Sequence, residues 1–359
     1  MRLFRRNRDQ NEGGAAVLDR PQVKLPDRAD DDFRGTTDEL FAEIERLTLA
    51  NRADPDRTRE REILRLRHMA GVRLLIESRG TSPQHPEADF GSLPDADVLP
   101  EIAAADLTPG LVRAGILRDG CVLVRGLIDR QAARELAAQI DRSFAERARA
   151  VEGHAPAPGY YDEFVPREPF SIDLGARVWV QAGGGVLAPD APMVACEMLD
   201  LFASAGLSHL VADYLGERPL LSLQKTTLRK ATPDVPGAWH QDGKFMGDVR
   251  ALNLWLSLSR CGDEAPGLDL VPRRLDHLVD TETDEAVLAY QVSTAQAEKA
   301  AGDKPIFRPI FEPGDALLFD EMFLHQTASD PSMPRPRYAI ESWFFGASAF
   351  PGEYGPIAV

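Results

Sequence analysis

Two histidines and one aspartate carry the clearest chemical signal in the chain: His240 and Asp242, separated by Gln241, and His325 further along. Two imidazoles and one carboxylate are the donor set that holds non-haem Fe(II) on one face of an octahedron and leaves three positions open. If Trp239 to Asp242 is extended, side chains i and i+2 point to the same side. His240 and Asp242 would then reach one metal ion, with Gln241 turned away. His325 would come from another strand that folding brings close.

A His-x-Asp triplet is a weak signal by itself, and the flanking segments strengthen it. Residues 252–259 alternate strictly, with leucines on one side and Asn253, Trp255, Ser257 and Ser259 on the other, which predicts a strand with one apolar and one mixed face. Pro313-Gly314 predicts a turn that leads into a buried strand ending at Phe319. The segment 337–345 is again strand-like, and its odd positions carry Arg337, Ala339 and Glu341.

In order and spacing, these segments resemble the phytanoyl-CoA dioxygenase family of Fe(II)/2-oxoglutarate oxygenases, over about residues 105 to 347. The motifs that match are Trp239-His240-Gln241-Asp242, Asn253-Leu254-Trp255-Leu256, Pro266-Gly267-Leu268, Pro313-Gly314-Asp315, His325 and Arg337, together with the upstream strand within 117–127 and a helix from Asp129. One element departs from the family pattern, because Arg273-Arg274-Leu275-Asp276 stands between Pro272 and His277 where the family has Gly-Ser. That element shapes a loop, so the departure concerns substrate contacts and not the iron site.

The resemblance implies a mainly β fold with flanking helices, namely a double-stranded β-helix (jelly-roll) core over residues 101–359. It implies that His240, Asp242 and His325 hold Fe(II). The far carboxylate of 2-oxoglutarate needs a cation, and Arg337 suits it because a guanidinium fork matches a carboxylate. Arg335 is the rival, although it precedes Pro336 and lies outside the strand. The remaining cosubstrate candidates are Thr327, for a hydroxyl contact, and more weakly Lys225 and Trp255, the last of which would serve equally as barrel core.

The implied chemistry uses O₂ at the last open metal position, converts 2-oxoglutarate to succinate and CO₂, and oxidises a small-molecule substrate that the sequence does not identify. Asp242 favours hydroxylation or a related oxidation, because related halogenases carry a small residue in its place. Two alternatives stay open: a cupin-like metal protein that does not use 2-oxoglutarate, and a catalytically silent jelly roll that serves as an interaction module.

Composition sets the broad class. The chain of 359 residues is 43% hydrophobic and can bury a large core. Its net charge of −16 disfavours nucleic-acid binding. No apolar run approaches the length of a membrane span, and no apolar stretch follows the basic residues 1–8 as in a secretory signal. The three widely spaced cysteines are expected to be reduced thiols of a cytoplasmic protein.

Three regions are expected along the chain: a disordered tail over 1–35, a helical extension and linker over 36–100, and the oxygenase domain over 101–359. Thr36 to Glu39 predicts a capping box, and Pro55 suits the first turn of a second helix. The apolar stripes of these two helices must pack on the barrel or on a second copy of the chain, so a homodimer through them is possible. Further helices are expected over 131–144 and 198–215, and a polar helical insertion over 280–304. The Pro- and Gly-rich stretch 152–192 could be a mobile segment over the site. His68 is expected at the surface and His277 in a loop.

Overall fold

The computed structural model describes residue 24 and residues 31–235, 237–247 and 249–359. Most of the expected tail therefore lies outside the described residues. Its last part is packed against the body of the protein, because Arg73 forms an ion pair with Asp31 at 2.6 Å and donates to the Gly35 carbonyl at 2.8 Å.

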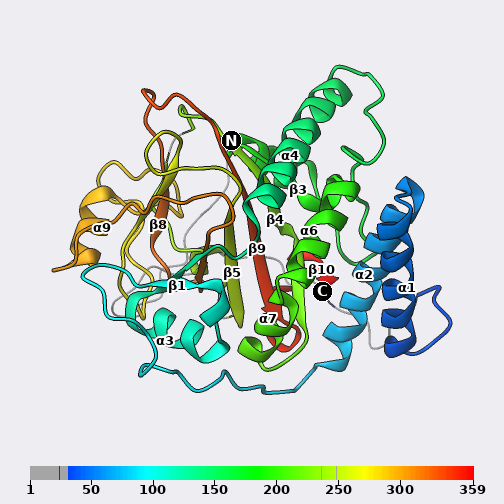
Figure 1. Cartoon of the computed structure of the whole chain (residues 1–359), viewed down its shortest axis with the longest axis horizontal. Coiled ribbons are helices and arrows are strands. Elements are labelled where there is room, and N and C mark those ends of the chain that lie inside the picture. The colour runs from blue at the N-terminus through cyan, green and yellow to red at the C-terminus, as the bar shows by residue number, and fades with distance from the viewer. Residues whose placement is uncertain (1–23, 25–30, 236, 248) are drawn as a thin grey trace.

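A mixed sheet of eight strands forms the centre of the molecule (Figure 1). Its order is β1-β2-β7-β5-β9-β4-β10, with β3 pairing to β4, and only the β1–β2 pair is parallel. A second sheet consists of β6 and β8. The strands are β1 (Glu101–Ala103), β2 (Cys121–Arg125), β3 (Gly185–Leu187), β4 (Pro219–Ala231), β5 (Ala251–Ser257), β6 (Gly267–Leu270), β7 (Ala316–Phe319), β8 (His325–Ala328), β9 (Arg337–Gly346) and β10 (Pro356–Ala358).

Both faces of the large sheet are buried, as the alternation in β5 illustrates. Leu252, Leu254 and Leu256 point into a core that the sheet shares with helices. Trp255, on the opposite face, belongs to a second core that includes Leu268 and Leu270 of the small sheet. The expected apolar and mixed faces are thus both present, and the mixed face points into the space between the two sheets.

Helices cover the face of the large sheet that is turned away from the small one (Figure 1). They occupy more of the described residues than strands do, so "mainly β" underestimates the helical layer. The α-helices are α1 (Thr37–Ala53), α2 (Arg57–Glu77), α3 (Pro109–Asp119), α4 (Arg130–Val151), α5 (Leu174–Ala182), α6 (Pro192–Ser204), α7 (Leu207–Leu215), α8 (Gly243–Met246) and α9 (Thr294–Ala301), and single 3₁₀ turns lie at Ala104–Asp106, Ala188–Asp190, Ala347–Ala349 and Gly352–Tyr354.

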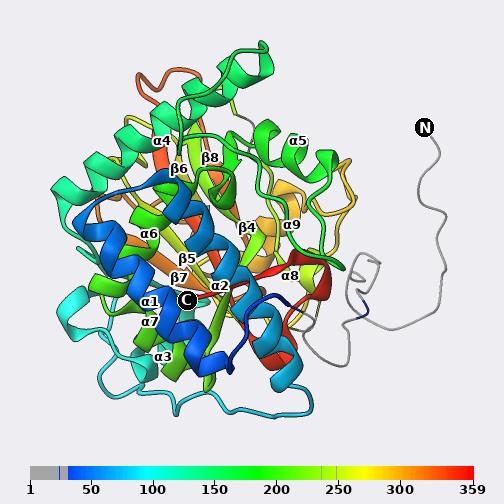
Figure 2. The same ribbon diagram turned by 90° about the vertical axis from the view of Figure 1, so that its right-hand side faces the viewer.

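The two N-terminal helices lie side by side and pack on the chain's own body (Figure 2). The capping box at Thr36 is confirmed, whereas α2 is capped by Asp56, which places Pro55 just before the helix. Their apolar residues form a core with strand β10 and the start of β4. The contact is close, because a Cβ added to Gly71 would lie 2.9 Å from the Pro356 Cβ.

His68 is buried, contrary to the expected surface position. Its Nδ1 lies 2.7 Å from the Pro356 carbonyl oxygen, and its Nε2 accepts from the Arg167 N–H at 3.1 Å. Burial lowers the pKa of His68 to about 4. The flanking arginines in the sequence gave the impression of a solvated face, but β10 covers this part of α2.

Two other segments also differ from expectation. The region 198–215 is not one helix, because α6 and α7 meet at Gly206 with a bend of 74°. Within 280–304 only α9 is helical. The stretch 152–192 contains α5, β3, the 3₁₀ turn Ala188–Asp190 and the first residue of α6, and its mobility stays a prediction. No single described helix is long and apolar enough to cross a membrane, and the bent pair α6–α7 meets that test only by length and composition. All three cysteines are free and buried.

Candidate metal centre

His240 and His325 face each other across an antiparallel bridge. The His240 N–H donates to the His325 carbonyl at 3.0 Å and the reverse bond is 3.2 Å, and the two ring centroids are 4.5 Å apart. The Nδ1 of His240 lies 2.7 Å from the Ala238 carbonyl oxygen, and that of His325 lies 3.1 Å from the Phe323 carbonyl oxygen. A carbonyl oxygen can only accept a hydrogen bond, so each ring carries its hydrogen on Nδ1 and keeps the lone pair of Nε2 for another partner, as metal-binding histidines do.

Asp242 completes the cluster, although its backbone differs from the expected strand. It is helical, with φ −65° and ψ −23°, and stands at the position before α8. Its carboxylate still meets the histidines, because the ligand atoms of His240, Asp242 and His325 lie within 4.8 Å of one another. The Asp242 Oδ2 atom is buried and has no hydrogen-bond partner among the described residues. A buried, unsatisfied carboxylate oxygen beside two imidazole lone pairs fits a divalent metal ion such as Fe(II).

Gln241, between the two ligands, points away as expected and anchors the segment. Its amide nitrogen donates to the carbonyls of His277 (3.1 Å) and Met322 (2.7 Å), and its oxygen accepts from the Val279 N–H at 2.7 Å. His277 itself lies in an exposed loop and contacts Asp276, so it is not part of the cluster.

The ring of His325 lies in an apolar wall. Phe319 and Phe323 contact it, with centroids 4.8 and 5.8 Å away. Burial, with a further contribution from His240, lowers the pKa of His325 to about 4. The imidazole is therefore neutral at physiological pH, which is the form that binds a metal.

Lys225 lies beside the cluster. Its Nζ atom is 3.6 Å from Asp242 Oδ1. A bulge in β4 between Leu221 and Thr226 gives this position its direction, and the Ser222 hydroxyl stabilises the bulge by accepting from the N–H groups of Gln224 and Lys225. Strand bulges commonly redirect a side chain next to a site.

Arg337 is buried between the two sheets, whereas its rival Arg335 is not. Arg337 donates to the Gly267 carbonyl at 2.9 Å, its guanidinium carbon lies 5.3 Å from the Trp255 ring centroid, and its Nε has no hydrogen-bond partner among the described residues. Burial lowers the pKa of Arg337 to about 10, which still leaves it charged. Arg335 is 71% exposed and lies 3.4 Å from Glu264.

Thr327 and Trp255, the other two cosubstrate candidates, occupy the same region. Thr327 pairs with Leu268, next to the Gly267 that receives the Arg337 bond, and it lies two residues along β8 from His325. Trp255 is buried in the core between the sheets and packs on Phe311 at 4.7 Å. Trp255 is thus part of the core, as one of its two expected roles required, and it also contacts Arg337, while its contact with the cosubstrate stays a prediction.

A cavity of about 400 Å³ adjoins the cluster. The sequence did not predict this cavity. Two of its lining residues lie next to the cluster: Lys225 is near Asp242, and the ring centroid of Tyr290 is 6.4 Å from that of His240. Its lining includes Glu341, the charged residue that shares a strand face with Arg337. In the sequence, the charge of Glu341 within a mostly apolar strand was the feature that could have indicated this cavity. The lining residues are Ala176, Trp179, Val180, Gln224, Lys225, Thr227, Arg229, Phe245, Leu288, Ala289, Tyr290, Glu341 and Tyr354.

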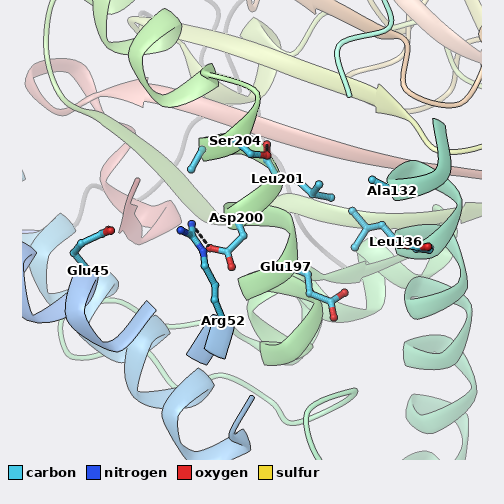
Figure 3. Close-up of a pocket in the computed structure, with 10 residues that line it drawn as sticks. Glu45, Arg52, Ala132, Leu136, Glu197, Asp200, Leu201 and Ser204 are labelled. Carbon is cyan, nitrogen blue, oxygen red and sulfur yellow. Dashed lines mark hydrogen bonds and ion pairs between the residues drawn. The ribbon is translucent and has the colours of Figure 1, made fainter. Parts of the chain in front are cut away.

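A larger hollow of about 640 Å³ lies elsewhere, among α1, α4 and α6 (Figure 3). Four of its residues are acidic, and Arg52 forms an ion pair with Asp200 at 2.9 Å. No histidine or cysteine lines it. It is therefore a solvated groove between helices and offers no counterpart to the His/Asp cluster.

The profile of the family described as phytanoyl-CoA dioxygenase (PhyH) matches residues 116–333. A search of curated proteins finds no match. Among solved structures, EctD from S. alaskensis with 2-oxoglutarate and 5-hydroxyectoine is 16% identical, with a TM-score of 0.47 over 75% of this chain and 88% of EctD. AviO1 from Streptomyces viridochromogenes Tue57 is 19% identical, with a TM-score of 0.43 over 67% of this chain and 96% of AviO1.

The profile match spans more than half of the chain and contains His240, Asp242 and His325, while Arg337 lies just beyond its end. The chain belongs to the phytanoyl-CoA dioxygenase (PhyH) family of Fe(II)/2-oxoglutarate-dependent oxygenases.

Proposed function

We propose that the protein hydroxylates a small molecule with Fe(II), 2-oxoglutarate and O₂, and forms succinate and CO₂. The observation that carries the proposal is the pairing of an unsatisfied two-His, one-Asp cluster with a buried guanidinium, Arg337, in the space between the two sheets. We interpret these opposed sheets as a jelly-roll core over residues 101–359.

In this proposal His240, Asp242 and His325 hold the iron. The two carbonyls that keep the proton on Nδ1 fix both imidazoles with Nε2 toward the ion. Phe319 and Phe323 fix the His325 ring and keep water away from one side of it. Bound Fe(II) would supply the activation of O₂ that this family uses.

Arg337 would bind the far carboxylate of 2-oxoglutarate, with Thr327 as a hydroxyl partner. The unpaired Arg337 Nε supports this role, because a buried N–H without a partner is costly and a carboxylate oxygen would satisfy it. Trp255 supports the guanidinium from one face. Lys225, whose Nζ lies 3.6 Å from Asp242 Oδ1, would contact the near end of the same cosubstrate. Asp242 fills the third protein position, which favours hydroxylation.

The test is succinate release by the purified protein with Fe(II), ascorbate and 2-oxoglutarate, because many such oxygenases turn over slowly without substrate. We expect slow release that Asp242→Ala abolishes and that His277→Ala, a histidine outside the cluster, leaves unchanged. Iron binding without 2-oxoglutarate binding would favour a cupin-like metal protein. Absence of both would favour an interaction module.

A further inference from the structure

Glu341 places a carboxylate oxygen in the cavity beside the metal centre. It lies in β9, opposite Thr227 on one side and Trp255 on the other. The Oε2 atom accepts from Arg229 Nη2 at 2.7 Å, from Arg229 Nε at 3.1 Å and from the Thr227 hydroxyl at 3.4 Å. The Oε1 atom accepts no hydrogen bond from the described residues, and the side chain is 19% exposed to the cavity it lines.

Glu341 is ionised. Burial by itself would raise the pKa of this carboxyl, but the positive charges of Arg229 and Lys225 outweigh burial and lower the pKa to about 2. The cavity therefore contains a carboxylate that is paired with Arg229 through Oε2 and has Oε1 left to accept a donor.

The cations of the same cavity are already engaged. Arg229 uses Nε and Nη2 on Glu341 and donates from Nη1 to the Gly183 carbonyl at 3.0 Å. Lys225 faces Asp242. An anionic substrate would have to draw one of these cations away from its carboxylate, whereas a cationic substrate would meet Glu341 Oε1 directly.

The cavity walls also favour a cation, because four aromatic side chains line it: Trp179, Phe245, Tyr290 and Tyr354. Tyr290 packs on Phe245 at 5.1 Å and on Trp179 at 5.4 Å between ring centroids. The Lys225 ammonium already lies 4.8 Å from the centroid of Phe245 and 5.7 Å from that of Tyr354. The electron-rich faces of aromatic rings attract ammonium groups in this distance range.

We propose that the substrate carries a protonated amine or quaternary ammonium group that binds at Glu341 Oε1 among these rings, with a compact apolar body along Ala176, Val180 and Leu288. A cavity of about 400 Å³ suits a small molecule at the lower end of the usual range of ligand sites. The inference rests on the proposed function and names the substrate class of that site.

The experiment compares three probes of similar size and different charge: 2-phenylethylamine, 2-phenylethanol and 3-phenylpropionate. Binding is measured by calorimetry under anaerobic conditions on the full chain with Fe(II) and 2-oxoglutarate. We expect the amine to bind about tenfold or more tightly than the alcohol, since it gains a charge-assisted hydrogen bond and cation–ring contacts, and the propionate to bind most weakly.

Glu341→Gln should weaken the amine about tenfold and leave the alcohol nearly unchanged. The propionate should gain affinity in this variant, because Arg229 loses its partner. Glu264→Gln, on the exposed side chain that faces Arg335, is the matched control and should change nothing. If Glu341→Gln does not fold, Trp179→Leu gives an independent test. It keeps an apolar side chain, removes a ring face, and should weaken the amine but not the alcohol.

Preference of the unmodified protein for the propionate or the alcohol overturns the proposal. So does the absence of amine binding at millimolar concentration in protein that still binds 2-oxoglutarate, or an equal effect of Glu341→Gln on amine and alcohol. If the unmodified protein does not bind 2-oxoglutarate, the proposed function itself is overturned. The two failures are therefore distinguishable.

Discussion

The ammonium of Lys225 lies 3.6 Å from a carboxylate oxygen of Asp242, and aromatic rings flank it on two sides. The buried Asp242 therefore has a positive neighbour before any metal binds. We expect bound Fe(II) to supply the positive charge instead, and Lys225 then to pair with 2-oxoglutarate.

Lys225→Met tests this exchange. We expect the iron-free protein to lose about 1–3 kcal/mol of stability, because Asp242 is left buried without a counter-charge. For a chain of this size that corresponds to a fall in Tm of several degrees. Fe(II) should raise the Tm of the variant more than that of the unmodified protein. Equal Tm shifts on iron addition would show that Lys225 does not balance Asp242.

Iron binding should depend on the three ligands and not on the neighbouring loop. His240→Ala and Asp242→Ala are each expected to bring the iron content from one ion per chain to nearly zero, because two remaining donors cannot fill one face of the coordination sphere. Metal analysis after dialysis measures this, with circular dichroism to verify folding. His277→Ala should keep full iron content. Stoichiometric iron in a folded His240→Ala/Asp242→Ala protein would rule out the site.

Arg337 should set the affinity for 2-oxoglutarate. Arg337→Ala leaves the cosubstrate carboxylate without its bidentate guanidinium partner. The binding free energy should weaken by about 2–4 kcal/mol, which raises the Kd measured by calorimetry roughly 30- to 1,000-fold. Arg337→Lys should recover part of the loss, since it keeps the charge and not the fork. Iron content should stay normal.

Arg335→Ala is the control for that series, because its side chain is exposed and faces Glu264. This variant should change the Kd for 2-oxoglutarate little. The reverse result, with Arg335 and not Arg337 controlling the affinity, would mean that β9 starts in a different register. No effect of either substitution would argue against 2-oxoglutarate itself.

His68 should make stability depend on pH. Its pKa is about 4 when folded, below the ordinary value near 6.5 of the unfolded chain, so the unfolded state takes up the proton first. The contribution of neutral His68 to the free energy of unfolding is present above pH 6.5 and is lost as the pH falls toward 4. From pH 7.5 to 5 the loss is about 2 kcal/mol. Urea denaturation at both pH values should show a smaller loss for His68→Gln, and the same loss in both proteins would contradict the assignment.

The contact between α2 and β10 should matter for stability. Gly71→Val adds a side chain whose Cβ alone would lie 2.9 Å from the Pro356 Cβ, so overpacking should cost about 1–3 kcal/mol. Thermal melting measures the change, and Ala53→Val, at the exposed end of α1, should melt like the unmodified protein. If both variants melt alike, the helical extension does not depend on this contact.

The fold brings His240, Asp242 and His325 together, as the sequence predicted, but the sequence did not predict their local geometry. The expected extended backbone holds at His240 and fails at Asp242, which already has helical angles before α8. A four-residue helix has no periodic pattern that a sequence could show. The convergence of the three side chains is nevertheless preserved, because the bridge to His325 fixes His240 and the start of α8 directs Asp242.

Features that depend on pairing between distant strands could not be predicted from local patterns. Glu341 was visible as a charge on the face of Arg337, but its partner Arg229 follows from the register of β4 against β9. The burial of His68 depends on β10, nearly 300 residues later in the chain. In both cases the sequence shows each residue and not its partner.

Gln241 has a practical consequence for engineering. Its amide is held by two carbonyls and one N–H from two separate loops, so Gln241 anchors the neighbouring candidate ligands His240 and Asp242 to residues 277–279 and Met322. The preceding residues 273–276 are where this chain departs from its family's pattern. If loops were exchanged between relatives, we therefore expect the site to bind iron only when the transplanted loop restores the backbone hydrogen bonds to the Gln241 amide.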